Sequence, residues 1–404
     1  MHRFCTSRWH SSTNRPQAAT VCPSPGRAAG RPGPAQVGKR PVAGGRVGST
    51  GVTSVADADA DGARRSSSDA AGVAVLGACA LWSLITAAAH SGRPEGVLLA
   101  VLAVAAGYAA GRICGALAPV AAPLTGALAG AALTIGVPHL APGPQPGAPL
   151  GHAGATAALL ALATGAACCA AWSTAVPALR PGLWAVAAGI VATAAVLGTT
   201  TGVLAGAAVL LWSLAAGRVS HRGAGLAGLA VVAASVTGLT WAVASGALPG
   251  GPAASLEGPL TRHRVELWQD ALALARQEPA VGVGPGRFGE LSATSGASPL
   301  SDGKPHSALL QQAAEQGAIG VALLAAAFCW MLYALWRTAR PTAVALSAGA
   351  ALTALASVAS VGNALSFTAV SVGAGLLAGL ATARPLTAEP ARQQSVVPRD
   401  RPMP

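Results

Sequence analysis

Side chains able to bind an anion or move a proton are concentrated in residues 261–320, and long apolar runs flank this stretch on both sides. Its charged residues and its histidine near the end are Arg262, Arg264, Glu266, Asp270, Arg276, Glu278, Arg287, Glu290, Asp302, Lys304, His306 and Glu315. Guanidinium groups bind phosphate and carboxylate, and a histidine exchanges a proton near neutral pH. In a chain otherwise poor in charge, this concentration predicts where the chemistry lies.

An amphipathic helix is expected over residues 262–276, because apolar side chains recur at three- and four-residue steps: Val265, Trp268, Leu272 and Ala275. Arg264 and Trp268 are four residues apart and would share a face of this helix. Two interpretations are open. The composition favours a helix on the membrane surface, with Trp268 among the headgroups. Alternatively, Arg264 together with Arg262 binds a phosphate of a substrate.

The glycine-rich run Gly282-Val-Gly284-Pro-Gly286-Arg287-Phe288-Gly289 contains a GxGxxG spacing. A dinucleotide site needs a strand before this spacing, whereas here a helix and a proline precede it, so we reject that function. A tight turn is the simplest interpretation. The alternative is an anion-binding nest, in which the amides of Gly284 and Gly286 face a phosphate.

His306 and Ser307 stand where the chain is expected to enter its next apolar helix, and Glu315 follows within that run. A histidine at this place is either structural or a general base or phosphate ligand. A carboxylate at the start of an apolar run is functional or paired by default.

The elements that hold these residues are predicted to be membrane-spanning helices. The chain has 404 residues, of which 52% are hydrophobic and 10% are charged, while a soluble chain is about a quarter charged. The prediction is an all-α, polytopic integral membrane protein of about ten helices, with one large loop between the seventh and eighth. The expected spans are 71–89, 96–111, 113–137, 152–176, 183–198, 201–216, 223–245, 318–336, 342–361 and 366–382.

Arginines between the apolar runs predict the orientation. Placing both ends in the cytoplasm puts the connections that contain Arg112, Arg180 and Arg337 on the same side, and it leaves only Arg93 in the short loops opposite. The expected organisation is a disordered basic tail (1–69), a membrane domain (70–383) with an extracytoplasmic loop (246–317), and a second disordered tail (384–404). The net charge of +12 is explained by these orientation charges, so no nucleic-acid partner is expected. Neither the cysteine spacing nor the loop carboxylates form a metal motif, so no metal or other cofactor is expected either.

The ordered set Arg264-Val-Glu-Leu-Trp268, Pro279, Gly-Val-Gly-Pro-Gly-Arg-Phe288, Pro-His306-Ser and Glu315-Gln-Gly317 resembles the signature region of the O-antigen ligase/polymerase family. Those proteins are polytopic membrane glycosyltransferases with one large periplasmic loop. The resemblance covers about 60 residues of the present chain. Two departures stand out: Ser307 replaces the family's asparagine, and Thr199-Thr200-Thr201 stand where a Ser-Arg pair is common.

The resemblance implies a mechanism. The donor would be a glycan on a polyprenyl diphosphate, the acceptor a hydroxyl of a glycan or lipid, and the reaction would need no nucleotide. Arg264 and His306 would be catalytic, while Arg262, Arg287, Gly284 and Gly286 would bind the diphosphate. Trp268, Glu315 and Ser307 would support them. The transfer reaction would be a step of cell-envelope or exopolysaccharide synthesis.

Two other functions compete with this one. A polysaccharide transporter or flippase would need ionisable residues or broken helices at mid-membrane in related halves of the chain, and residues 96–256 contain no acidic residue. A non-catalytic membrane scaffold is kept open by the missing Ser-Arg pair. Replacing Arg264 and His306 separates an enzyme from a scaffold.

Overall fold

Regular structure in the described residues is entirely helical, as predicted. The computed structural model describes residues 50–140, 149–247, 262–297 and 303–386. Seven described helices are long and apolar enough to cross a membrane, and three shorter ones are similarly apolar. These helices are α1 (Thr50–His90), α2 (Glu95–Leu117), α3 (Ala121–Leu140), α4 (Pro149–Ser173), α5 (Arg180–Val196), α6 (Thr200–Ala216), α7 (Arg222–Ala244), α12 (Ala308–Arg337), α13 (Thr342–Val361) and α14 (Thr368–Thr382). A polytopic, all-α membrane protein is therefore confirmed.

Two predicted boundaries are wrong. Helix α1 begins at Thr50, so residues 50–69 are not the unstructured tail that we expected; the prolines that would break a helix all precede this segment. Residues 1–49, the rest of that predicted tail, lie outside the described part. The break expected near residue 112 lies instead at residues 118–120, where Pro119 supplies no backbone N–H. Arg112 is thus part of α2 rather than of a connection.

Helices α4 and α13 form the centre of the bundle, and most of each is buried. The residues buried around them are mainly alanine, leucine and valine from α4, α6, α7, α12, α13 and α14. Cys168 and Cys169 are buried in this cluster, in agreement with the prediction that they are small packing residues. The core is therefore built from side chains small enough to let helices approach closely.

The closest helix pair is α2 and α14. A Cβ atom on Gly107 or Gly111 of α2 would overlap the backbone of α14, and one on Gly375 or Gly379 of α14 would overlap α2. Glycines on both helices thus bring two backbones into direct contact, as the abundance of small residues predicted.

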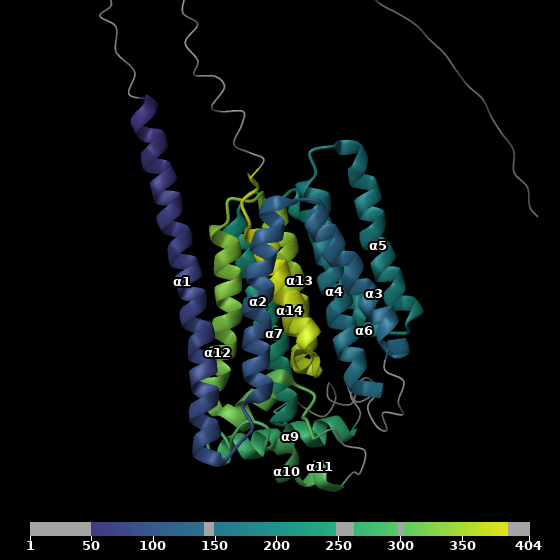
Figure 1. The fold of residues 1–404 in the computed structure, drawn as a ribbon. Helices are drawn as coiled ribbons and strands as arrows, with labels where there is room; N and C mark the ends of the chain where they lie inside the picture. The colour runs from purple at the N-terminus through teal and green to yellow at the C-terminus, as the bar shows by residue number, and fades with distance from the viewer. Residues whose placement is uncertain (1–49, 141–148, 248–261, 298–302, 387–404) are drawn as a thin grey trace, which may run out of the picture. The chain divides into compact units, whose positions relative to one another are not determined.

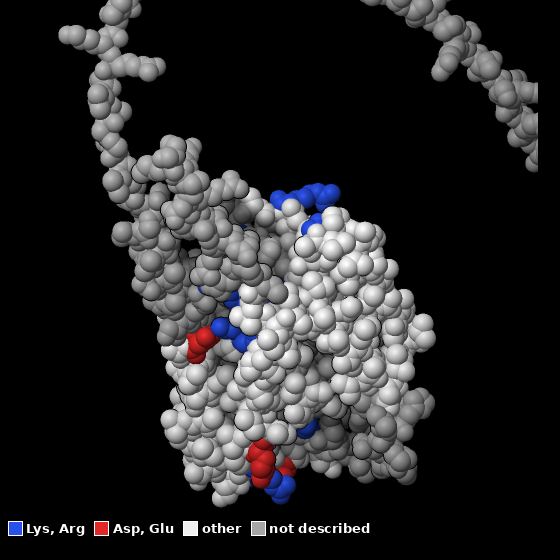
Figure 2. Space-filling model, turned by 45° about the horizontal axis from the view of Figure 1, so that its top comes forward, with Lys and Arg blue, Asp and Glu red and all other residues white. Residues whose placement is uncertain are grey.

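The described residues between α7 and α12 lie across one end of the bundle (Figure 1). They include α9 (Arg262–Gln277), α10 (Phe288–Leu291) and α11 (Ala293–Ala297). The predicted helix over 262–276 is confirmed as α9. Figure 2 shows that uncharged residues cover most of the described surface on one face, which suits contact with lipid.

Candidate functional site

Trp268 anchors α9 to the rest of the protein. Its side chain is 0% exposed and belongs to a buried cluster with Leu272 of α9, Phe288 of α10, and Leu310 and Ala314 of α12. The interpretation that Trp268 sits among lipid headgroups is therefore wrong: the apolar face of α9 packs on protein. This cluster joins the helix that carries Arg264 to the helix that begins just after His306.

Arg264 lies one turn before Trp268, and it is partly buried. Its guanidinium donates a 3.4 Å hydrogen bond to the carbonyl oxygen of Val361, the last residue of α13. No carboxylate among the described residues lies within ion-pair distance of it. Burial lowers the pKa of the Arg264 guanidinium, because removing a charge from water disfavours the charged form. The group remains a cation at neutral pH, and among the described residues only one of its five N–H donors makes a hydrogen bond.

The glycine-rich turn binds an anion, but that anion is Glu315 of the same chain. The amide of Gly284 donates to the Glu315 carbonyl oxygen at 3.0 Å, and the backbone amides of Gly286 and Phe288 lie close enough to the Glu315 carboxyl group to interact with it. Of the two predicted diphosphate ligands, Gly284 thus uses its amide within the protein, and the amide of Gly286 faces the Glu315 carboxyl group. In this structure the buried Glu315 side chain occupies the position that a bound anion would take.

Two glycines let the turn and α12 cross at contact distance. Gly317 has a φ of 67°, a left-handed conformation that glycine adopts without steric cost, and it bends α12. A Cβ atom on Gly317 would overlap the carbonyl group of Ala280, and one on Gly282 would meet the backbone of Gln316. Next to the bend, the Ala318 amide donates to the Pro279 oxygen at 2.8 Å. The glycine of the Glu-x-Gly signature therefore allows the turn to pack directly against α12.

The connection between α1 and α2 is a part of the site that sequence reasoning missed. The Arg93 amide donates to the Pro285 oxygen at 2.7 Å, and Arg287 donates to the carbonyl oxygen of His90 at 3.1 Å. Arg287, predicted to bind diphosphate, thus holds the end of α1 and pairs loosely with Glu290 at 3.9 Å. The available signal was Arg93, the one basic residue of the short loops opposite the predicted cytoplasmic side.

His306 and Ser307 form the entry to α12. His306 has a φ of 52°, and Ser307 is buried and caps the helix by accepting from the Leu310 amide at 3.4 Å. Ser307 thus has a local structural role that asparagine, another strong cap, would also fill. Arg262 is the first residue of α9, and its side chain is not among those that the structure describes. Lys304 is close enough to interact electrostatically with Glu315.

Asp270 stabilises the distal part of the site. It accepts hydrogen bonds from the Ser292 hydroxyl at 2.7 Å and the Thr294 amide at 2.9 Å. Burial raises the pKa of the Asp270 carboxyl, but these bonds outweigh that effect and hold the pKa below its ordinary value. Asp270 thereby ties α9 to the start of α11 and acts as a structural group. In the part of the chain that the structure describes, no group of three or more His, Cys, Asp or Glu residues is arranged to hold a metal ion.

Removing the Glu315 carboxylate tests its structural role. Glu315→Ala removes the carboxyl group that the Gly286 and Phe288 amides face, and leaving the buried Phe288 amide without it costs about 1–3 kcal/mol. We expect a lower midpoint of thermal unfolding in detergent. Glu290→Ala is the matched control, because Glu290 is exposed and its loose ion pair contributes at most about 1 kcal/mol. Equal midpoints for the two variants would contradict the filled nest.

Fold and site together define a multi-pass membrane protein whose structured loop presents a partly buried guanidinium at one end of the helices. Residues 153–325 match the model of the family described as O-antigen ligase. This region, which runs from α4 into α12 and includes every predicted site residue, belongs to that family, so the predicted resemblance is confirmed. The match covers less than half of the chain. No curated protein and no solved structure matches the chain. The family assigns a membrane glycosyltransferase activity of the O-antigen ligase or polymerase type.

Proposed function

We propose that this protein transfers a glycan from a polyprenyl-diphosphate donor to an acceptor hydroxyl on the extracytoplasmic face of the cell membrane. This reaction would be a step of cell-envelope or exopolysaccharide synthesis, and its acceptor would be a glycan or a lipid. The observation that carries it is Arg264: a partly buried cation without a carboxylate partner among the described residues, fixed by Trp268 beside the end of α13.

Transfer of this kind breaks the bond between the anomeric carbon of the glycan and the diphosphate oxygen, as the acceptor oxygen forms a new bond to that carbon. The bonding electrons leave with the diphosphate, which gains negative charge. A fixed guanidinium stabilises this growing charge more strongly in the transition state than in the ground state. Arg264 fits the role because its site is already formed and its burial reduces screening by water.

His306 is the proposed acceptor of the hydroxyl proton. It directly precedes α12, and its backbone conformation is set by the capped start of that helix. With Gly284 and Gly286 committed to Glu315, the diphosphate would rely on Arg264, Arg262 and the remaining donors of Arg287. The proposal thereby also accounts for the absence of a Ser-Arg pair at Thr199–Thr201, because α9 already supplies guanidinium groups.

Both termini are proposed to be cytoplasmic. Under this orientation the end of the bundle that carries α9, α10 and α11 faces outward, where a lipid-linked donor is available and nucleotide sugars are not. The arginines at the opposite end then follow the positive-inside rule.

The test is the pool of polyprenyl-diphosphate-linked glycan in a deletion strain, compared with strains that re-express wild type, Arg264→Ala or His306→Ala at matched protein levels. We expect the pool to accumulate on deletion and only wild type to clear it. An unchanged pool on deletion, in a strain without a second family member, would overturn the proposed reaction. Clearance by both variants would overturn the assignment of the site but not the reaction.

A further inference from the structure

A groove runs between α1 and α2 at the end of the bundle opposite to α9. It has a volume of about 430 Å³ and a mainly apolar lining that includes Val73, Leu76, Ala105, Ala109 and Ile113, with Trp330 of α12 as its floor. In Figure 1, α12 lies between α1 and α2, the two helices that supply most of the groove's lining. At 1.5 Å per residue, the stretch of α2 from Ala105 to Ile113 spans about 12 Å, and Tyr108 and Arg112 lie within it.

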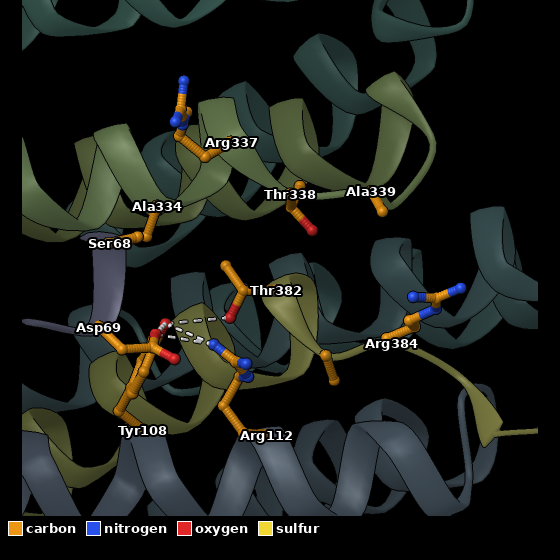
Figure 3. Close-up of a pocket in the computed structure, with 11 residues that line it drawn as sticks. Ser68, Asp69, Tyr108, Arg112, Ala334, Arg337, Thr338, Ala339, Thr382 and Arg384 are labelled. Atoms are coloured by element: carbon orange, nitrogen blue, oxygen red, sulfur yellow. Dashed lines mark hydrogen bonds and ion pairs between the residues drawn. The ribbon is translucent and has the colours of Figure 1, made fainter. Parts of the chain in front are cut away.

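Beside the apolar lining of the groove lies a polar cluster of Asp69, Tyr108, Arg112 and Thr382. In Figure 3 these four side chains converge from α1, α2 and α14. Arg112 contacts Asp69 at 3.0 Å and the Tyr108 hydroxyl at 3.1 Å, and Thr382 donates to the same hydroxyl at 3.4 Å. A single nitrogen of Arg112, Nη1, makes both of its contacts, so its other nitrogens remain available for a second anion.

The surroundings of this cluster are positively charged. Arg337 and Arg384 line the adjoining pocket beside Arg112, whereas Asp69 is the one acidic residue in its lining. Both arginines point away from the cluster in Figure 3, so they contribute to the local field rather than to the hydrogen bonds drawn. The Nε of Arg337 is buried and has no hydrogen-bond partner among the described residues.

From this juxtaposition we propose that the groove binds an anionic phospholipid, with one acyl chain along α2 and its phosphodiester at Arg112. The apolar lining matches a hydrocarbon chain, and the three arginines against one aspartate match a negative headgroup. Lipid is the favoured occupant over a soluble anion because the apolar groove is continuous with the basic cluster: Asp69, Tyr108 and Arg112 line both. The Asp69–Arg112 ion pair would then hold the guanidinium in position to bind the headgroup.

Native mass spectrometry of the delipidated full-length protein in detergent provides the test. Phosphatidylglycerol and phosphatidylcholine with identical acyl chains are titrated separately, and inorganic phosphate is added as a competitor. We expect the anionic lipid to bind at least about tenfold more tightly, an energy difference of about 1.4 kcal/mol, and phosphate at millimolar concentration to leave it bound.

Three variants assign the site. Ala109→Trp fills the groove without changing charge and should weaken both lipids. The double variant Asp69→Asn/Arg112→Gln removes the ion pair without leaving an unpaired charge and should abolish the preference for phosphatidylglycerol. Arg180→Gln, which replaces an exposed arginine at the first position of α5, should change neither. An unfolding midpoint near that of wild type checks that each variant is folded.

Several results would overturn the proposal: equal binding of the two lipids, displacement of the lipid by phosphate, or undiminished binding to Ala109→Trp. The proposal would also be overturned if the protein binds neither lipid and instead forms a dimer through this face. Because the groove lies at the opposite end from α9, the outcome is independent of whether glycan transfer is confirmed.

Discussion

Arg264→Ala is expected to lower the rate of glycan transfer about 10²–10³-fold, the effect of removing one preorganised donor from a developing negative charge. The physical reason is the position of Arg264: its guanidinium is partly buried, has no ion-pair partner among the described residues, and is held by Val361 and the Trp268 cluster. The measurement is the initial rate at which lipid-linked glycan disappears in membranes from the deletion strain, with protein level matched by immunoblot.

Two further variants sharpen this test. Arg264→Lys keeps the charge but loses the planar fork of donors, so it should recover only part of the rate. Arg276→Ala is the matched control, since Arg276 is exposed on the last turn of the same helix and should transfer at the wild-type rate. If Arg264→Ala and Arg276→Ala have equal rates, Arg264 has no role in the chemistry.

His306→Asn is expected to slow transfer about 10²–10⁴-fold, the usual contribution of a general base. Asparagine is chosen because the φ of 52° at this position is left-handed, and asparagine tolerates that conformation better than alanine does. The variant therefore removes the imidazole while keeping the backbone close to its native form. The rate is measured in the same membranes, together with the unfolding midpoint.

His263→Ala is the control for His306, because His263 is an exposed histidine on α9 and no role is proposed for it. Wild-type transfer by His306→Asn, with an unchanged midpoint, would remove His306 from the mechanism. A loss of transfer that only accompanies a lower midpoint would instead identify His306 as a structural residue at the entry to α12.

The helical architecture was predictable because it depends on local properties. Long runs of alanine, leucine, valine and glycine define membrane helices by length and composition alone, whatever their neighbours. The amphipathic period of residues 262–276 likewise predicted α9. The boundary at Arg112 was misplaced because a charge suggested a loop, whereas in the structure Asp69 and Tyr108 hold Arg112 within the helix.

What the sequence determined by itself is the class of membrane protein, the stretch in which the site lies and the family of that stretch. Only the tertiary structure decided which groups remain available to a substrate. Gly284 and Gly286 were predicted to bind phosphate, yet the Gly284 amide donates to the carbonyl oxygen of Glu315, a residue about thirty positions away in the chain, and the Gly286 amide faces the carboxyl group of the same residue. One interpretation placed Trp268 among the lipid headgroups, yet its side chain is buried where α9 packs against α10 and α12. Periodicity is carried by near neighbours in the sequence, but the partner of a buried polar group is set by contacts between distant segments, and such contacts exist only once the chain has folded.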